Sequence, residues 1–275
     1  MKQFVILSTD YNPDYLFYTP ITAAIWKHFG FEPIIISVYD LDSAPLFEKY
    51  ASLVHETCRK QGIYNIETYF NSKGLRFSTP TIVQSIRLWG FLSPRINAED
   101  YVVLGDIDMI PLNSFLNRDF DKVNSFGFDL TDRTQIPICY VGMQKKKWME
   151  IVPNISTLQC YPNCLNKMQD FPQSRSVHFE DYWFTDQIML TKFMQDYGFD
   201  KINFIDRGKE PSGFARLRVD RGDWKWQEGV EYMDAHLPRN PLQNFELVYE
   251  LIKSKINTDI EWISQYTKEF RQLAE

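Results

Sequence analysis

Tyr101-Val-Val-Leu-Gly-Asp-Ile-Asp-Met-Ile-Pro-Leu112 is the stretch that decides the fold, because an apolar run ends there in two carboxylates, Asp106 and Asp108. A buried strand carries such a pair only at its carboxyl end, where side chains meet solvent or a ligand. Two acids this close repel each other unless a cation lies beside them. Mg²⁺ or Mn²⁺, held by carboxylates together with a substrate phosphate, would be such a cation. The alternative is a solvated acid pair at the edge of a loop.

The first hundred residues alternate between short apolar runs and longer amphipathic ones. Strands separated by helices of this length predict a parallel sheet with right-handed crossovers and ligands at the carboxyl ends of the strands. Asp106 and Asp108 come at such an end, as do Thr9, Asp10 and Tyr11 after the first strand. The expected strands are 4–8, 33–38, 64–69 and 101–105, and the expected helices are 20–29, 46–60 and 79–91.

Beyond Pro111 the regular alternation of short apolar runs with longer amphipathic runs ends. Residues 124–130 and 136–143 look like two strands joined by a turn, and a helix is expected at 145–152. Thr185 and Asp186 begin a helix whose apolar positions keep one face until Gly198. The C-terminal segment is predicted to be helical, with one break, and the sequence contains no internal repeat. We therefore expect one compact α/β unit.

The composition excludes several classes of protein. A chain of 275 residues with 44% hydrophobic residues is expected to fold into a globule. A net charge of −6 argues against nucleic acid as a partner, since nucleic-acid binders usually carry a basic surface. The four cysteines lack any repeated pair spacing and are expected to be thiols in a reducing compartment. No apolar stretch is long enough for a membrane span, so we expect a soluble, cytoplasmic protein without an integral membrane segment.

Four short blocks carry a resemblance to a known family. Their order and separation resemble glycosyltransferases of the GT-A fold, the nucleotide-sugar-dependent group whose metal is held by an Asp-x-Asp motif. The resemblance covers about residues 4–239. The blocks are Gly105-Asp-Ile-Asp108, Ile138-Cys-Tyr-Val-Gly-Met143, Phe184-Thr-Asp-Gln-Ile188 and Asp234-Ala-His-Leu-Pro-Arg239.

The resemblance implies an α/β fold with a Rossmann-like nucleotide-binding half and a mixed, mainly parallel central sheet flanked by helices. It implies a single domain over 1–275, with the nucleotide-binding half at 1–112, the acceptor and metal half at 113–240, and C-terminal helices at 241–275. The implied activity is transfer of a sugar from a nucleotide donor, UDP-sugar by preference, to a glycan or other hydroxyl acceptor.

The same resemblance implies a cofactor, Mn²⁺ or Mg²⁺, held by Asp106, Asp108 and His236. Asp106 would also face the ribose, and Arg239 would bind the diphosphate, for which a planar guanidinium is well shaped. An ordinary histidine and a solvated arginine are the plain alternatives for His236 and Arg239.

Further donor-binding residues follow from the resemblance. Thr9, Asp10 and Tyr11 match the base-binding region, with Tyr11 stacking on uracil. Arg87 matches a position that contacts the ribose or the donor sugar, although packing or a surface salt bridge would also explain Tyr11 and Arg87. Gly142 matches a glycine that lets the donor sugar lie against the backbone.

The stereochemistry and the catalytic base remain open. Tyr140 and Val141 stand where one large subfamily has Asn-Ser, so retention is not implied and an inverting reaction is expected. An inverting enzyme needs a base for the acceptor hydroxyl. The candidates are Asp186, Glu180 and Asp181.

Three other classes of protein share some of these features. A phosphatase with an Asp-x-Asp motif would carry it after the first strand, and a nucleotidyltransferase would need a glycine-rich loop near the amino terminus, where residues 9–14 have no glycine. A non-catalytic nucleotide-sugar-binding protein would keep the pocket without the chemistry. The intact acid pair, together with His236 and Asp186, argues against that last class.

Overall fold

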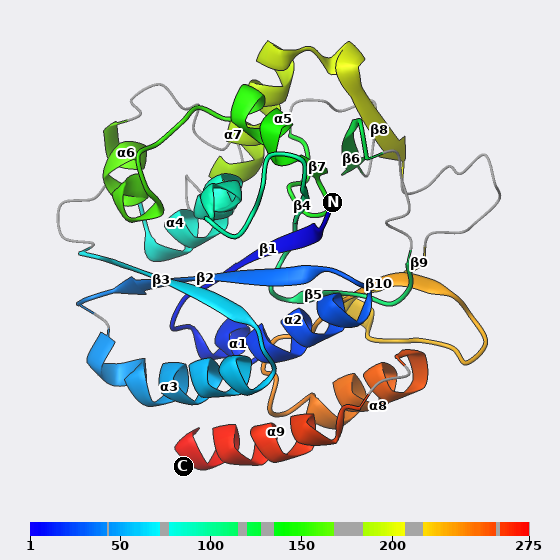
Figure 1. The fold of residues 1–275 in the computed structure, drawn as a ribbon. Coiled ribbons are helices and arrows are strands. Elements are labelled where there is room, and N and C mark those ends of the chain that lie inside the picture. The colour runs from blue at the N-terminus through cyan, green and yellow to red at the C-terminus, as the bar shows by residue number, and fades with distance from the viewer. Residues whose placement is uncertain are drawn as a thin grey trace.

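The fold is built on a seven-stranded central sheet (Figure 1). The computed structural model describes residues 1–42, 44–71, 77–114, 120–127, 135–167, 184–206, 217–256 and 259–274. Along the sheet the strands are β3 (Tyr64–Phe70), β2 (Glu32–Asp40), β1 (Gln3–Thr9), β4 (Tyr101–Leu104), β7 (Gly142–Gln144), β6 (Val123–Gly127) and β8 (Ile202–Asp206).

Most neighbours in this sheet run parallel. β3, β2, β1 and β4 are parallel, and so is the pair β6 and β8. β7 is antiparallel to both of its neighbours. The prediction of a mixed, mainly parallel sheet flanked by helices is therefore confirmed.

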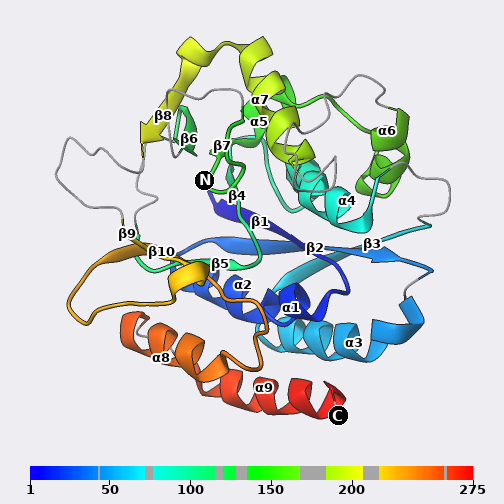
Figure 2. The same cartoon turned by 180° about the vertical axis from the view of Figure 1, so that it is seen from behind.

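Helices cover both faces of the sheet (Figures 1 and 2). One face carries α4 (Thr79–Ile86), α5 (Lys145–Ile151), α6 (Tyr161–Lys167) and α7 (Thr185–Tyr197). The other face carries α1 (Pro13–Leu16), α2 (Thr19–His28) and α3 (Ala44–Lys60), with α8 (Phe245–Lys255) and α9 (Glu261–Ala274) as the outermost layer. Short 3-10 turns are η1 (Arg87–Leu92), η2 (Leu158–Cys160), η3 (Phe199–Lys201) and η4 (Arg221–Asp223).

Each face of the sheet has its own apolar core, and the alternation of side chains along a strand explains why. On β1, Val5 and Leu7 belong to the core under α2 and α9, while Phe4 and Ile6 belong to the core under α4 and α7. Successive side chains of a strand point to opposite faces, so a strand covered on both sides is apolar throughout. The C-terminal helices join the first core, where the rings of Tyr50 on α3 and Phe270 on α9 lie 4.8 Å apart.

A second, three-stranded sheet brings residues near the C-terminal end of the chain close to Asp106 and Asp108. Its order is β5 (Met109–Pro111), β10 (Tyr232–His236) and β9 (Leu217–Val219). β10 runs antiparallel to β5 and pairs His236 with Met109. The backbone N–H of Leu237 donates to the carbonyl oxygen of Asp108 at 2.7 Å. This pairing places His236 beside the Asp-x-Asp segment.

The sequence predicted β1 to β4, α5 and α7 within a few residues, but the strand expected at 136–143 is wrong. Only its end is a strand, as part of β7, and residues 136–141 form a loop. Tyr140 has a φ of 64°, a left-handed conformation that interrupts an extended segment. Pro137 also lacks the N–H that a central strand would donate. The helix expected at 79–91 changes to a 3-10 turn at Arg87.

Two further observations bear on the sequence analysis. Within the described parts of the chain, no helix has both the length and the apolar character that a membrane span requires. All four cysteines lie in those parts, and none is joined to another by a disulfide.

Candidate active site

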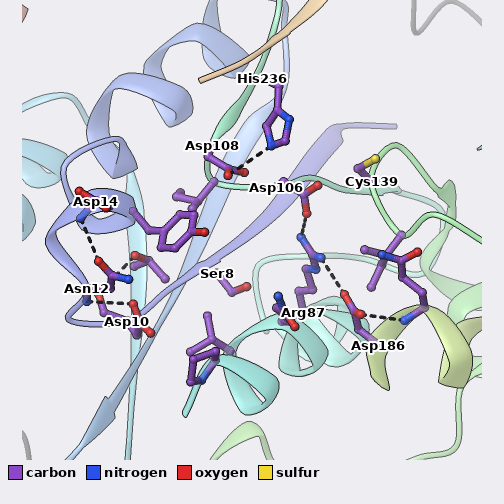
Figure 3. Close-up of a pocket in the computed structure, with 18 of the residues that line it drawn as sticks. Ser8, Asp10, Asn12, Asp14, Arg87, Asp106, Asp108, Cys139, Asp186 and His236 are labelled. Carbon is purple, nitrogen blue, oxygen red and sulfur yellow. Dashed lines mark hydrogen bonds and ion pairs between the residues drawn. The ribbon is translucent and has the colours of Figure 1, made fainter. Parts of the chain in front are cut away.

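A cavity of about 670 Å³ lies at the carboxyl ends of β1 and β4 (Figure 3). Its wall combines the end of β1, the start of α1, α4, the Asp-x-Asp segment, the loop before β7, the start of α7, η4 and the end of β10. Residues from all four sequence blocks therefore meet at one place. The predicted site residues that line the cavity are Thr9, Asp10, Arg87, Asp106, Asp108, Asp186, His236 and Arg239.

Arg87 connects the acid pair to α7. Its Nη1 donates to the carbonyl oxygen of Gly105 at 2.9 Å and forms an ion pair with Asp106 Oδ1. Its Nη2 donates to Asp186 Oδ2 at 2.9 Å, and Figure 3 shows the guanidinium lying between the two carboxylates. Burial disfavours the charge of Arg87, but Asp106 and Asp186 outweigh burial and raise the pKa of Arg87. The guanidinium is therefore a permanent cation that holds two acids from distant segments.

The two acids on Arg87 differ in their surroundings. Burial raises the pKa of Asp186 more than Arg87 lowers it, and the side chain of Asp186 is only 3% exposed. Burial is also the largest single effect on Asp106, whose side chain is 26% exposed, and it raises the pKa. The charge and hydrogen bond of Arg87, with smaller contributions from His236 and Arg218, together outweigh burial and lower the pKa of Asp106. Asp106 is thus held as an anion facing the cavity, while Asp186 is the stronger base of the pair.

Asp108 lies beside His236 and Arg221. His236 Nε2 is 3.5 Å from Asp108 Oδ2, a contact drawn in Figure 3. The Nη2 of Arg221 forms an ion pair with the same Oδ2, and Arg221 Nε donates to His236 Nδ1 at 3.2 Å. Burial lowers the pKa of His236, and Arg221 acts in the same direction against the attraction of Asp108. A neutral imidazole is the form that binds a metal.

The corner of the cavity formed by Asp106, Asp108 and His236 has ligand atoms that suit a divalent cation. As these side chains lie, however, they do not supply a complete set of ligands. Two carboxylates and an imidazole are suitable ligands for Mn²⁺. Within the described ranges, however, no three His, Cys, Asp or Glu side chains lie close enough together to hold one ion. Asp106 is turned to Arg87, and Asp108 is paired with Arg221. Asp108 and His236 are the two candidates that face each other.

Two predicted residues do not line the cavity. The ring of Tyr11 stacks on Tyr39 with centroids 4.0 Å apart, and Tyr11 is largely buried there. Gly142 lies inside β7, where it pairs with Val103 of β4. A Cβ at this position would lie 2.6 Å from the hydroxyl of Tyr101, so packing inside the sheet explains the glycine. The last two candidates, Glu180 and Asp181, lie outside the described residues.

Sequence reasoning missed several residues of the cavity wall, including Tyr15 and Arg221. Tyr15 could have been found, because Asn12 followed by Pro13 is a helix start, and the Asn12 side chain accepts from the N–H of Asp14 at 3.1 Å. Tyr15 is then the aromatic residue that α1 presents to the cavity. No local sequence pattern of this kind marks Arg221 as a residue of the cavity wall.

Comparisons with known proteins give distant structural similarities. No protein-family model and no curated protein sequence matches the chain. The galactosyltransferase LgtC, solved in complex with donor and acceptor sugar analogs, is 13% identical with a TM-score of 0.48, over 96% of this chain and 100% of that one. The bifunctional glycosyltransferase WbbM, in its apo structure, is 12% identical with a TM-score of 0.44, over 98% of this chain and 51% of that one. The glycosyltransferase GlyE of Streptococcus pneumoniae TIGR4 is 11% identical with a TM-score of 0.45, over 99% of this chain and 65% of that one.

Proposed function

We propose that the protein is a metal-dependent glycosyltransferase that moves a sugar from a nucleotide donor, a UDP-sugar, to a hydroxyl group of a glycan or other acceptor. The observation that carries this proposal is the convergence of the acid pair, His236, Arg239 and Asp186 on one cavity. These residues come from separate blocks of sequence, and each offers a group that the reaction needs. A cavity of about 670 Å³ is within the size range of small-molecule sites.

The charges in the cavity suit a diphosphate leaving group. Sugar transfer leaves a nucleoside diphosphate whose developing negative charge must be stabilised by fixed cations. Arg239 is exposed and lines the cavity, so its guanidinium is available to phosphate oxygens. Tyr15 supplies an aromatic ring in the same wall. We assign the diphosphate to Arg239 and the base of the nucleotide to the side of the cavity formed by Thr9, Asp10 and Tyr15.

We propose Mn²⁺ or Mg²⁺ as the cofactor, held by Asp108 and His236 with Asp106 nearby. When bound, such an ion neutralises the phosphate oxygens of the departing nucleotide. Sites of this kind need only one or two carboxylates from the protein, because the phosphates complete the coordination. Asp108 and His236 then form the protein's part of a site that the nucleotide completes.

A screen of nucleotide sugars tests this function. The protein is incubated with Mn²⁺ and a panel of UDP-, GDP- and CMP-sugars, and released nucleotide is measured with and without simple glycan acceptors. We expect UDP from at least one UDP-sugar, with no release from the Asp108→Ala variant. Release of inorganic phosphate from sugar phosphates, without release of UDP, would instead identify a phosphatase.

Asp108→Ala is expected to weaken UDP binding in the presence of Mn²⁺ by about tenfold or more, which is about 1.4 kcal/mol. The variant removes an anionic ligand from the corner that faces His236. Isothermal titration calorimetry with UDP measures the change, and the difference from wild type should disappear when EDTA replaces Mn²⁺. Asp14→Ala is the matched control, because Asp14 is another acid of the cavity wall outside this corner. Equal UDP affinity in wild type and Asp108→Ala would contradict the metal assignment.

Arg239→Ala is expected to weaken UDP binding by about tenfold while leaving uridine binding unchanged, because the guanidinium binds phosphate oxygens. Calorimetry with the two ligands measures the contrast. Arg95→Ala is a suitable control, since Arg95 lies on the surface over the ring of Tyr64 and outside the cavity wall. A similar loss for UDP and uridine would place Arg239 outside the phosphate site.

A further inference from the structure

The two arginines on the acid pair are held in different ways. Arg87 is buried, with its side chain 7% exposed, and it is bound by Asp106, Asp186 and the carbonyl oxygen of Gly105. Arg221 lies on the short turn η4, and its side chain is 21% exposed. Asp108 is the acid with which Arg221 forms an ion pair. Arg87 is thus held by three partners in a buried position, whereas Arg221 is more exposed and pairs with one acid, Asp108, besides its contacts with His236 and Tyr15.

Arg221 occupies the two groups that would bind a cation. Its Nη2 is paired with Asp108 Oδ2, and its Nε donates to His236 Nδ1 at 3.2 Å. A metal ion needs lone pairs on the same carboxylate and the same imidazole. The guanidinium therefore competes with a divalent cation for Asp108 and His236.

The charge balance of the corner favours the exchange. Three carboxylates, Asp106, Asp108 and Asp186, face the two guanidiniums of Arg87 and Arg221, which leaves one negative charge in excess. A divalent cation in place of Arg221 would balance all three acids. Buried charges that are not balanced are costly, so replacing the single positive charge of Arg221 by a double one is favourable among these side chains.

We propose that Arg221 is an exchangeable counter-ion of Asp108 that sets the affinity of the free protein for a divalent cation. The cation displaces the guanidinium from Asp108 and His236, and Arg221 keeps metal binding weak until the cation arrives with its phosphate ligand. The identity of the cation rests on the proposed function, but the competition for Asp108 is inferred from the contacts of Arg221 with Asp108 and His236 alone.

Mn²⁺ binding to the nucleotide-free protein tests this inference, with free Mn²⁺ measured by electron paramagnetic resonance. Arg221→Gln is expected to bind Mn²⁺ about tenfold more tightly than wild type, within the usual range of coupling between competing ligands. Arg95→Gln is the matched control and is expected to stay close to wild type. It removes the same charge from an exposed position outside the cavity wall. Equal or weaker binding by Arg221→Gln, or no binding by either protein, would overturn the proposal.

A second measurement uses the wild-type protein, so it does not depend on how the variant folds. Phenylglyoxal modifies accessible guanidiniums, and mass spectrometry locates the modified residues. Saturating Mg²⁺ is expected to accelerate the modification of Arg221 several-fold and to leave Arg87 unmodified, because only Arg221 is released. An unchanged or slower reaction at Arg221 would refute the exchange. Neither measurement involves a sugar nucleotide, so metal exchange without any UDP release would reject the proposed function alone.

Discussion

Arg87→Met is expected to lower the free energy of unfolding by about 3–5 kcal/mol, the usual loss when one partner of a buried ion pair is removed. The variant keeps an unbranched side chain of similar length but leaves Asp186 and Asp106 without their shared cation. Asp186 is the more affected of the two, because its side chain is almost fully buried. Chemical denaturation at pH 7, followed by circular dichroism, measures the change.

The double variant Arg87→Met/Asp186→Asn is the control for this explanation. It removes the carboxylate that the single variant leaves buried and unpaired, so it should be more stable than Arg87→Met alone. If both variants lose the same stability, packing around Arg87 rather than charge pairing holds this part of the fold.

The stability loss of Arg87→Met should also depend on pH. In wild type, burial already raises the pKa of Asp186 above its ordinary value. Without Arg87 the largest effect that opposes burial is lost and only smaller ones such as the Gln187 N–H remain, so the folded-state pKa of Asp186 rises further above the unfolded value. The folded state then binds a proton more tightly than the unfolded state, and the loss at neutral pH should shrink as pH falls through the folded-state pKa. A loss that stays constant between neutral and acidic pH would contradict the charge argument.

Asp186→Asn is expected to reduce sugar transfer by about 10²–10⁴-fold, the usual contribution of a general base, while the affinity for the UDP-sugar stays near wild type. Asp186 lines the cavity, and its raised pKa makes it a stronger base than an exposed carboxylate. Its Oδ2 accepts from Arg87 and its Oδ1 from the N–H of Gln187 at 2.8 Å. A carboxylate has about four lone-pair positions, so both oxygens can still accept another hydrogen.

The pH dependence separates a base from a residue that only positions Arg87. With Asp186 as the base, kcat of the wild type rises through an acidic pKa, and this limb disappears in Asp186→Asn. The matched controls are Glu180→Gln and Asp181→Asn, the other two acids that the sequence offers. Normal transfer by Asp186→Asn, together with a collapse in either control, would move the base to that earlier pair.

Local patterns in the sequence were sufficient for the first half of the fold. β1 and β2 are continuous apolar runs, and α3 and α7 keep apolar residues on one face, so periodicity and strand length identify them. The strand expected at 136–143 failed because Tyr140 adopts a left-handed conformation that its residue type does not announce. β9 and β10 were not predicted, because short strands with mixed polar residues owe their existence to the partner strand beside them.

The cavity, like the fold, was predicted from the sequence only in part. The sequence alone determined that an acid pair ends a buried strand, since the apolar run and the two carboxylates are adjacent along the chain. Only the tertiary structure decided what neutralises these acids. Arg87 lies 19 residues from Asp106 and 99 from Asp186, and Arg221 lies 113 residues from Asp108. Attraction between charges depends on distance in space and on burial, neither of which can be read from separation along the chain. The pairing of β10 with β5 and the position of η4 therefore decide that Arg221 meets Asp108 and His236.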